Sequence, residues 1–180
     1  MKKFLTAVIA GLAFLSSFGT TPVSAAEEGP WVDPKRFTIE NDGGGVVNDF
    51  KAALEYFKKE KLAVSVSGYC ASACTLILSK DYNLDVCVKP DVRFGIHKPF
   101  FMDMLGVPAN KLIYIYKSEL MWKNEFLGKY PEWLQKAIAA RGDVPAVIQG
   151  DAPNELMWFS YDDVRAFMRT CVTREQVESK

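Results

Sequence analysis

The chain has 180 residues, with 22 basic side chains, 22 acidic side chains and a single histidine, so its formal net charge at neutral pH is zero. This balance argues against a general electrostatic attraction to nucleic acid or to an anionic membrane. We therefore expect partners to be selected by shape and by the chemistry of a particular site.

The first 25 residues are typical of a cleaved signal peptide. Two lysines precede an apolar run at 4–15, and the small residues at 23–25 suit a signal peptidase. The alternative, a transmembrane anchor, is disfavoured because the run is shorter than the roughly 20 residues of a bilayer span. We predict one mature domain at 26–180, with its core at about 37–170, that is periplasmic or secreted and has no stable membrane anchor.

Four cysteines, Cys70, Cys74, Cys87 and Cys171, all lie in the part expected to be exported. An even number in an oxidising compartment favours disulfides, and three pairings are possible. Cys70 and Cys74 flank Ser72, so a bridge from either would fix the turn that presents this serine. Two alternatives are less favourable: metal ligation lacks a second pair of closely spaced cysteines, and a cysteine nucleophile needs a reduced thiol.

The first half of the domain alternates strands and helices. We predict a short strand at 36–39, a glycine-rich turn at 41–45 and a helix at about 46–60. A strand at 61–67 follows, with alternating and β-branched residues, and then a short apolar helix at 73–79.

The helix predicted at 46–60 has one apolar face. Phe50, Ala53, Leu54 and Phe57 recur at the spacing i, i+3, i+4 and i+7. We expect this face to pack on a sheet.

The second half begins with two short strands, at 85–88 and 92–96, separated by a turn at Pro90 and Asp91. A long helix is predicted from 110 to about 127, and another at 131–141 with proline in its first turn.

Near the end of the chain, Ser160 followed by acidic residues predicts the N-cap of a final helix that reaches about residue 170. Strands lead into helices three times along the domain. The order of elements therefore predicts a single-domain α/β layered fold with its active groups at the ends of strands.

Ser72 and His97 are the candidate catalytic pair. Ser72 follows a strand and opens a helix, where backbone N–H groups are free and the helix dipole is positive. His97 is the only histidine and ends a predicted strand. A serine hydroxyl needs a base to take its proton, and imidazole is the usual one, unless a lysine serves. The structural alternatives are a helix cap for Ser72 and a packed, hydrogen-bonded ring for His97.

A second set of hydrogen-bond donors follows the first strand, at Gly43, Gly44 and Gly45. Glycine lets the backbone approach a ligand closely, and amides at the start of a helix can stabilise a developing negative charge. We predict an oxyanion hole made by the amide of Gly43 or Gly44 and that of Ala73. A simple turn is the alternative for these glycines.

Three segments carry a family resemblance: IENDGGGVVNDF, SGYCASACTLIL and VRFGIHKPF, in this order along the chain. They resemble the ClpP-like serine peptidase family of the ClpP/crotonase superfamily, and the chain looks closest to a branch of small exported relatives with a CASACT-type motif. The resemblance covers roughly 37–170. It implies a ClpP/crotonase-like layered fold of repeated ββα units.

The resemblance also implies roles for single residues. Gly43 and Gly44 take the positions of the family's glycine loop, Ser72 that of the nucleophile and His97 that of the base. The helix at 110–127 resembles the handle helix through which such subunits associate, which implies that the chain forms a homo-oligomer.

Three positions depart from the family pattern. Asp42 stands where the family usually has proline, and Lys98 stands where glutamine is common. The family's third catalytic acid has no clean counterpart: Asn154 is the nearest match, with Glu155 and Asp151 close by.

The leading interpretation is an exported ClpP-like serine hydrolase that acts on a peptide or protein substrate and needs no metal or nucleotide cofactor. The first alternative, favoured by Asp42 and the missing acid, is a catalytically inactive module that binds a peptide or a protein. The second is a crotonase-type enzyme acting on an acyl thioester. Export argues against it, because coenzyme A is a cytoplasmic metabolite.

Overall fold

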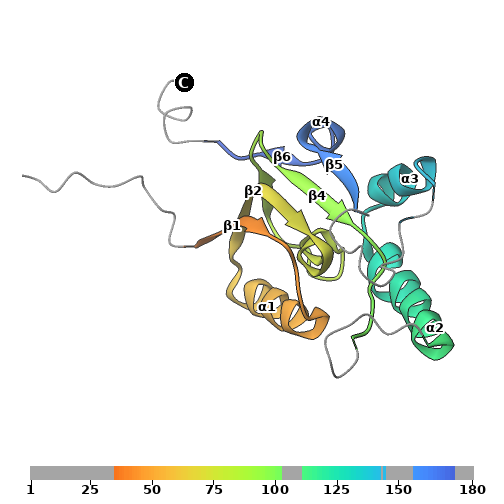
Figure 1. The fold of residues 1–180 in the computed structure, drawn as a ribbon. Helices are drawn as coiled ribbons and strands as arrows, with labels where there is room; N and C mark the ends of the chain where they lie inside the picture. The colour runs from red at the N-terminus through yellow and green to blue at the C-terminus, as the bar shows by residue number, and fades with distance from the viewer. Residues whose placement is uncertain (1–34, 103–110, 143, 145–155, 173–180) are drawn as a thin grey trace, which may run out of the picture. The chain divides into compact units, whose positions relative to one another are not determined.

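The computed structural model describes residues 35–102, 111–142, 144 and 156–172. The predicted signal peptide and Asn154, Glu155 and Asp151 lie outside these ranges. In the described residues, six strands form one sheet in the order β5-β4-β2-β3-β6, with β1 paired to β2 (Figure 1). No helix within the same ranges is long and apolar enough to cross a membrane.

The strands and helices alternate along the chain, which confirms the predicted α/β class. In chain order the elements are β1 (Arg36–Asp42), α1 (Val47–Glu60), β2 (Ala63–Ala71), the 3₁₀ helix η1 (Ser72–Leu78), β3 (Val86–Val88), β4 (Arg93–Ile96), α2 (Leu112–Met121), the π-helical turn η2 (Trp122–Phe126), the 3₁₀ turn η3 (Leu127–Lys129), α3 (Glu132–Ala140), β5 (Met157–Ser160), α4 (Tyr161–Val164) and β6 (Arg169–Thr170).

Strand β2 organises the sheet. It pairs in parallel with β1 on one side, and on the other side with β3 along its first half and β4 along its second half. Asp42 therefore lies opposite Cys70, and Ala71 lies opposite Gly95. The carboxyl ends of β1, β2 and β4 meet at one edge of the sheet, where ligands usually bind in open α/β sheets.

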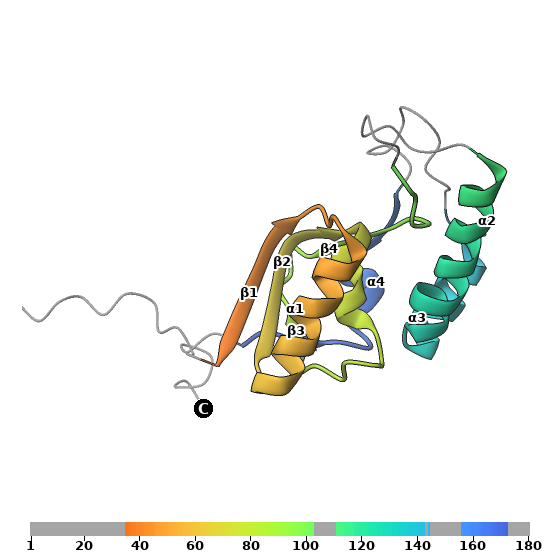
Figure 2. The same ribbon diagram turned by 90° about the horizontal axis from the view of Figure 1, so that it is seen from below.

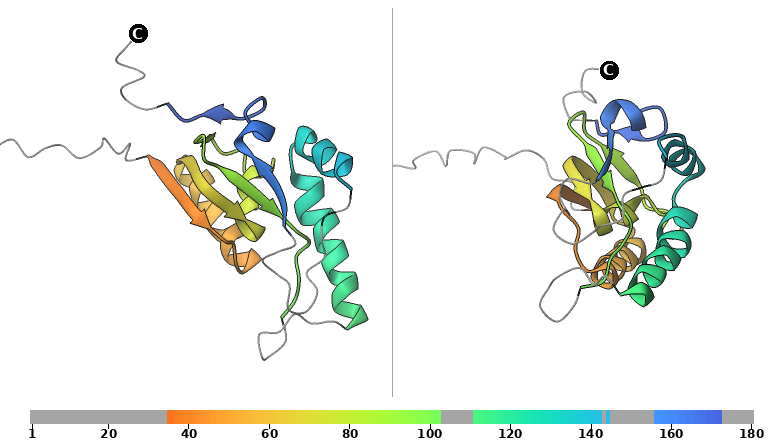
Figure 3. Two further views of the ribbon diagram at one scale, coloured as in Figure 1. Left: turned by 45° about the horizontal axis from the view of Figure 1, so that its top comes forward. Right: turned by 45° about the vertical axis from the view of Figure 1, so that its right-hand side comes forward.

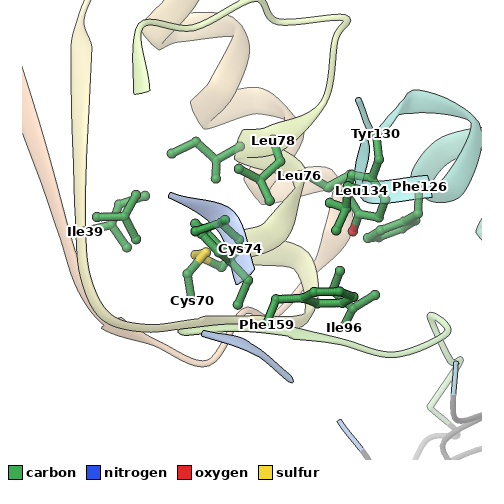
Figure 4. Close-up of a cluster of buried hydrophobic side chains, with 14 of the residues drawn as sticks. Ile39, Cys70, Cys74, Leu76, Leu78, Ile96, Phe126, Tyr130, Leu134 and Phe159 are labelled. Atoms are coloured by element: carbon green, nitrogen blue, oxygen red, sulfur yellow. A yellow bond between two sulfur atoms is a disulfide. The ribbon is translucent and has the colours of Figure 1, made fainter. Parts of the chain in front are cut away.

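Helix α1 covers one face of the sheet beside β1 and β2 (Figure 2). Leu54 and Phe57, two residues of its predicted apolar face, are buried, whereas Phe50 is half-buried and Ala53 is exposed. The buried cluster continues into η1 and the α3 region, where Leu76, Tyr130 and Leu134 pack together with Phe126 (Figure 4).

The end of the chain corrects the prediction of a long final helix. Ser160 is an N-cap, with its backbone N–H and its hydroxyl both bonded to Asp163 Oδ2, at 2.7 and 2.8 Å, but α4 ends at Val164. The chain then becomes strand β6, because the Cys171 N–H donates to the Val88 carbonyl (2.9 Å) and Cys171 is bonded to Cys87. This long-range pairing overrides the local helical signal.

Two further differences concern the second half. The helix predicted at 110–127 is interrupted, because α2 gives way to the π-helical turn η2 before residue 127. Strand β5, which pairs antiparallel with β4, was not among the predicted elements.

The cysteines form two disulfides, Cys70–Cys74 and Cys87–Cys171, with Cα–Cα distances of 5.4 and 4.9 Å. The prediction of disulfides is confirmed, and the structure selects one of the three possible pairings. No cysteine thiol is left free as a nucleophile.

Candidate functional site

Ser72 lies at the point where β2 ends and η1 begins, and its backbone is left-handed, with φ of 56°. A non-glycine residue in this region is uncommon and costs of order 1–3 kcal/mol, so the surrounding structure must hold it there. A sharp turn from strand to helix is also one way in which hydrolases present a nucleophilic hydroxyl. The half-buried Ser72 therefore has the backbone geometry of a candidate nucleophile.

The turn at Ser72 is held by a disulfide and by side-chain hydrogen bonds. The buried Cys70–Cys74 disulfide closes over it (Figure 4). The Thr75 hydroxyl donates to the Ser72 carbonyl at 2.6 Å. Thr75 Oγ1 also lies 2.6 Å from the hydroxyl of fully buried Tyr130. Burial raises the pKa of Tyr130, although the hydrogen bond with Thr75 opposes this. The protonated phenol therefore donates to Thr75, which in turn holds the Ser72 carbonyl.

Gly44 lies directly against this turn. A Cβ atom on Gly44 would lie 2.6 Å from the Ala71 carbonyl oxygen and 2.7 Å from both Ala73 N and Ser72 Cβ. The φ of Gly44 is 83°, a backbone conformation that residues with a Cβ atom rarely adopt. Only glycine fits here, and the structure brings the predicted glycine loop and the predicted nucleophile into contact.

Asp42 occupies one of the predicted oxyanion donors. The Gly44 N–H donates to Asp42 Oδ1 at 2.7 Å, so this amide is engaged within the loop itself. The Ala73 amide belongs to the first turn of η1, where N–H groups have no partner inside the helix. Gly43 is exposed, and no atom lies within 4 Å of the position that a Cβ would take there. Of the three predicted oxyanion donors, the amides of Gly43 and Ala73 are therefore the ones left to bind an oxyanion.

His97 directly follows β4, beside the end of β2. Because Ala71 pairs with Gly95 in a parallel ladder, Ser72 and His97 both leave the sheet at the same edge. The ring is buried, with 7% of the residue exposed, and His97 Nδ1 lies 2.6 Å from the Lys98 carbonyl oxygen. A carbonyl only accepts, so Nδ1 carries the proton and Nε2 has the free electron pair that a general base needs.

The environment of His97 favours the neutral ring. Burial lowers its pKa, against a smaller upward effect of the hydrogen bond with the Lys98 backbone. A neutral imidazole is the form that can accept the proton of a serine hydroxyl.

The structure does not join the predicted pair by a hydrogen bond. Among the hydrogen bonds of the described residues, Ser72 takes part through its carbonyl and His97 through Nδ1, and none links Ser72 Oγ to the ring. Proton transfer needs these groups within about 3.2 Å, a contact that often tightens only when substrate is bound. The catalytic pair therefore stays a prediction.

The segment after His97 is tied to α2. Lys98 is buried, and its Nζ lies 2.9 Å from Glu119 Oε1 on α2. The Ser118 hydroxyl, one residue earlier on α2, donates to the Pro99 carbonyl. These contacts position the backbone that holds the imidazole, and the buried ammonium of Lys98 already serves in an ion pair.

The sequence reasoning missed Thr75, Tyr130 and Glu119 as supports of the site. Thr75 carries a local signal, because a threonine three residues after Ser72 can bond back to its carbonyl. Tyr130 and Glu119 carry none, because each reaches its partner only through the tertiary fold. Within the described ranges no group of three or more His, Cys, Asp or Glu side chains is arranged to hold a metal ion.

Known proteins similar to this chain are found among solved structures. No protein-family model and no curated protein matches the chain. Among solved structures, a variant of ClpP1 from Listeria monocytogenes is similar over 79% of this chain and 77% of its own, with 18% sequence identity and a TM-score of 0.49.

Proposed function

We propose that this chain is an exported serine hydrolase that cleaves peptides, with Ser72 as nucleophile and His97 as general base. The observation that carries the proposal is the left-handed Ser72 at the end of β2, held against the Gly44 backbone at the sheet edge from which His97 also leaves. Backbone strain of this kind clusters at active sites, where the surrounding structure holds it.

The proposed reaction uses groups of this chain alone. Ser72 Oγ attacks the carbonyl carbon of a peptide bond while His97 Nε2 takes the hydroxyl proton. The amides of Gly43 and Ala73 stabilise the oxyanion, and the imidazolium then returns the proton to the leaving amine. Water hydrolyses the acyl-enzyme by the same route. The Gly44 amide joins the hole only when Asp42 releases it.

The Lys98 carbonyl orients the imidazole in this proposal. It accepts the Nδ1 proton, which is the part that a third catalytic residue plays in a serine triad. The predicted third catalytic residue is still Asn154, or Glu155 or Asp151 beside it in the sequence, and all three lie outside the described residues.

Peptide hydrolysis tests the assignment. Purified protein should cleave fluorogenic peptides or unfolded casein, and Ser72→Ala should reduce turnover by at least about a thousandfold, as removal of a catalytic serine does. Ser79→Ala, at another buried serine near the far end of η1, is the matched control and should keep activity. Equal turnover by the Ser72→Ala variant would overturn the proposal.

A second candidate is the inactive module that binds a peptide or protein, and the Asp42 carboxylate favours it. A negative charge on the glycine loop opposes an oxyanion beside it. The two candidates predict opposite results for Asp42→Asn, which keeps an acceptor for Gly44 but removes the charge. A hydrolase should become on the order of tenfold faster, about 1.4 kcal/mol, whereas an inactive module should gain no turnover.

Export is part of the proposal and is supported by the two disulfides, which form and persist in oxidising compartments. Amino-terminal sequencing of protein recovered from the cell envelope or the medium should begin at Ala26. A chain that begins at Met1 and remains in the cytoplasm would contradict it.

Self-association through α2 is also proposed. None of the α2 residues is buried, and its exposed apolar side chains include Leu112 (85% exposed), Ile113, Ile115, Tyr116 and Leu120. Such an apolar surface marks an interaction site in soluble proteins. Light scattering should show an oligomer that Ile115→Lys dissociates and the exposed control Lys123→Glu does not. A wild-type monomer at micromolar concentration would refute this part.

A further inference from the structure

Within the described residues, one edge of strand β1 is unpaired. Among the described residues it pairs only with β2, and the views of Figure 2 and Figure 3 show it at the border of the sheet. The Ala63 N–H donates to the Lys35 carbonyl at 2.8 Å. Because backbone groups alternate in a parallel ladder, Phe37 and Ile39 also bond to β2, and the N–H and C=O groups of Thr38 and Glu40 point outward. Such an edge is a template for another strand.

An apolar cavity of about 240 Å³ opens between β1 and α1. Its lining is mostly apolar: Phe37, Ile39, Phe50, Ala53, Leu54, Phe57 and Cys74, together with Asp42 and Asp49. A drug-sized ligand needs about 300 Å³ or more, so this space suits one bulky side chain. Phe37 and Ile39 project toward the cavity from β1, so a strand added to β1 would direct alternate side chains toward the same space.

One end of the cavity is negatively charged, and this charge favours a particular residue beside the apolar side chain of a bound peptide. Asp42 ends β1 and Asp49 lies in the first turn of α1, so both carboxylates line the same end. Neither forms an ion pair with any residue in the described ranges. Two such carboxylates beside an apolar space favour a cation that follows an apolar anchor.

We propose that the β1 edge and this cavity bind an extended peptide that carries a bulky apolar side chain with a lysine or arginine two residues away. A strand rises about 3.3 Å per residue, so the lysine or arginine of the peptide lies about 7 Å along the strand from the apolar side chain. Ile39 and Asp42 are roughly 10 Å apart by the same rise, and the long side chain of the lysine or arginine spans the remaining distance. Main-chain hydrogen bonds would supply affinity and the pocket would supply specificity.

A second copy of this chain is a poorer occupant. Its own Phe37 packs on Phe57, with ring centroids 4.7 Å apart, so its β1 has no free apolar side chain for the cavity. The proposed docking uses neither Ser72 nor His97, and it stands whether or not the chain is a hydrolase.

The test measures fluorescence anisotropy of a labelled heptapeptide, Thr-Lys-Thr-Phe-Thr-Lys-Thr, on the purified protein. Lysines on both sides of the phenylalanine allow either strand direction. We expect saturable binding that the Ser72→Ala variant retains, and at least tenfold weaker binding when the peptide phenylalanine becomes alanine or its lysines become glutamates. Equal binding of these peptides would overturn the proposal.

Matched variants locate the site. Ala53→Phe fills the cavity, whereas Ala52→Phe, also exposed on α1, does not line it. Glu40→Pro removes an outward N–H from the edge, whereas Glu40→Ala keeps it. Ala53→Phe and Glu40→Pro should each weaken binding at least tenfold, with circular dichroism unchanged, and their controls should not. The proposal is overturned if the peptide does not bind to the wild-type protein, or if a variant and its control weaken binding equally. It is also overturned if the wild-type protein is a dimer that Glu40→Pro dissociates.

Discussion

Gly44 and Ser72 approach so closely that a methyl group on Gly44 would lie 2.7 Å from Ser72 Cβ. The contact joins the loop after β1 to the turn after β2, and it brings a predicted donor loop to a predicted nucleophile. Both residues have positive φ, which glycine adopts readily and serine does not, so the strained backbone of Ser72 lies against a residue that must be glycine.

Gly44→Ala should therefore disturb the site. The new methyl group would meet the backbone at Ala71 and Ala73, and the positive φ of this position is unfavourable for alanine. We therefore expect a loss of about 2–3 kcal/mol of unfolding free energy. Gly43→Ala is the matched control, because that position has open space and no positive φ. Urea unfolding of both variants checks this, and equal stabilities would count against the contact.

Thr75→Val should weaken the support of Ser72. Valine has nearly the shape of threonine, but it leaves the buried Tyr130 hydroxyl and the Ser72 carbonyl without their partner. The expected loss of unfolding free energy is about 1–3 kcal/mol, together with lower turnover. Thr75→Ser keeps the hydroxyl and should retain turnover. If valine and serine variants have the same turnover, the hydrogen bonds do not position Ser72.

Local patterns predicted many elements near the site. The spacing of Phe50, Ala53, Leu54 and Phe57 predicted the apolar face of α1, of which Leu54 and Phe57 are buried. The predicted glycine loop lies against Ser72 through Gly44. The prediction of the buried face of α1 succeeds because it depends only on residues close in sequence.

Contacts between distant segments could not be predicted in the same way. The final helix was wrong beyond Val164, because pairing of β6 with β3 and the Cys87–Cys171 bond draw the chain into the sheet. The hydrogen bond between Thr75 and Tyr130 also depends on where η3 packs, which no local pattern specifies.

The single histidine allows a direct test of its environment. Burial lowers the folded pKa of His97 below the ordinary value of about 6.5. The unfolded chain then binds more protons at acidic pH, so the stability that neutral His97 contributes is present above about pH 6.5 and is lost as pH falls through the folded pKa. The imidazole proton resonance should titrate with a midpoint below 6.5. A midpoint above this value would contradict the buried, neutral ring.

The two disulfides should differ in their effects. They close loops with sequence separations of 4 and 84, for which chain entropy gives about 2 and about 4.5 kcal/mol of stabilisation. Replacing Cys87 and Cys171 by alanine should cause the larger loss of stability. Replacing Cys70 and Cys74 by alanine should cause the smaller loss of stability but the larger loss of turnover, because the Cys70–Cys74 bond closes the Ser72 turn. Denaturant unfolding and peptide hydrolysis measure the two effects, and the reverse order in turnover would contradict the assignment.

The most direct measurement is the modification of the purified protein by a serine-reactive fluorophosphonate, followed by mass spectrometry of its peptides. The account predicts one adduct, on Ser72, which Ser72→Ala abolishes and His97→Ala slows on the order of a hundredfold or more. An unmodified wild-type protein under conditions that label a control peptidase, or an adduct that persists in Ser72→Ala, would contradict it.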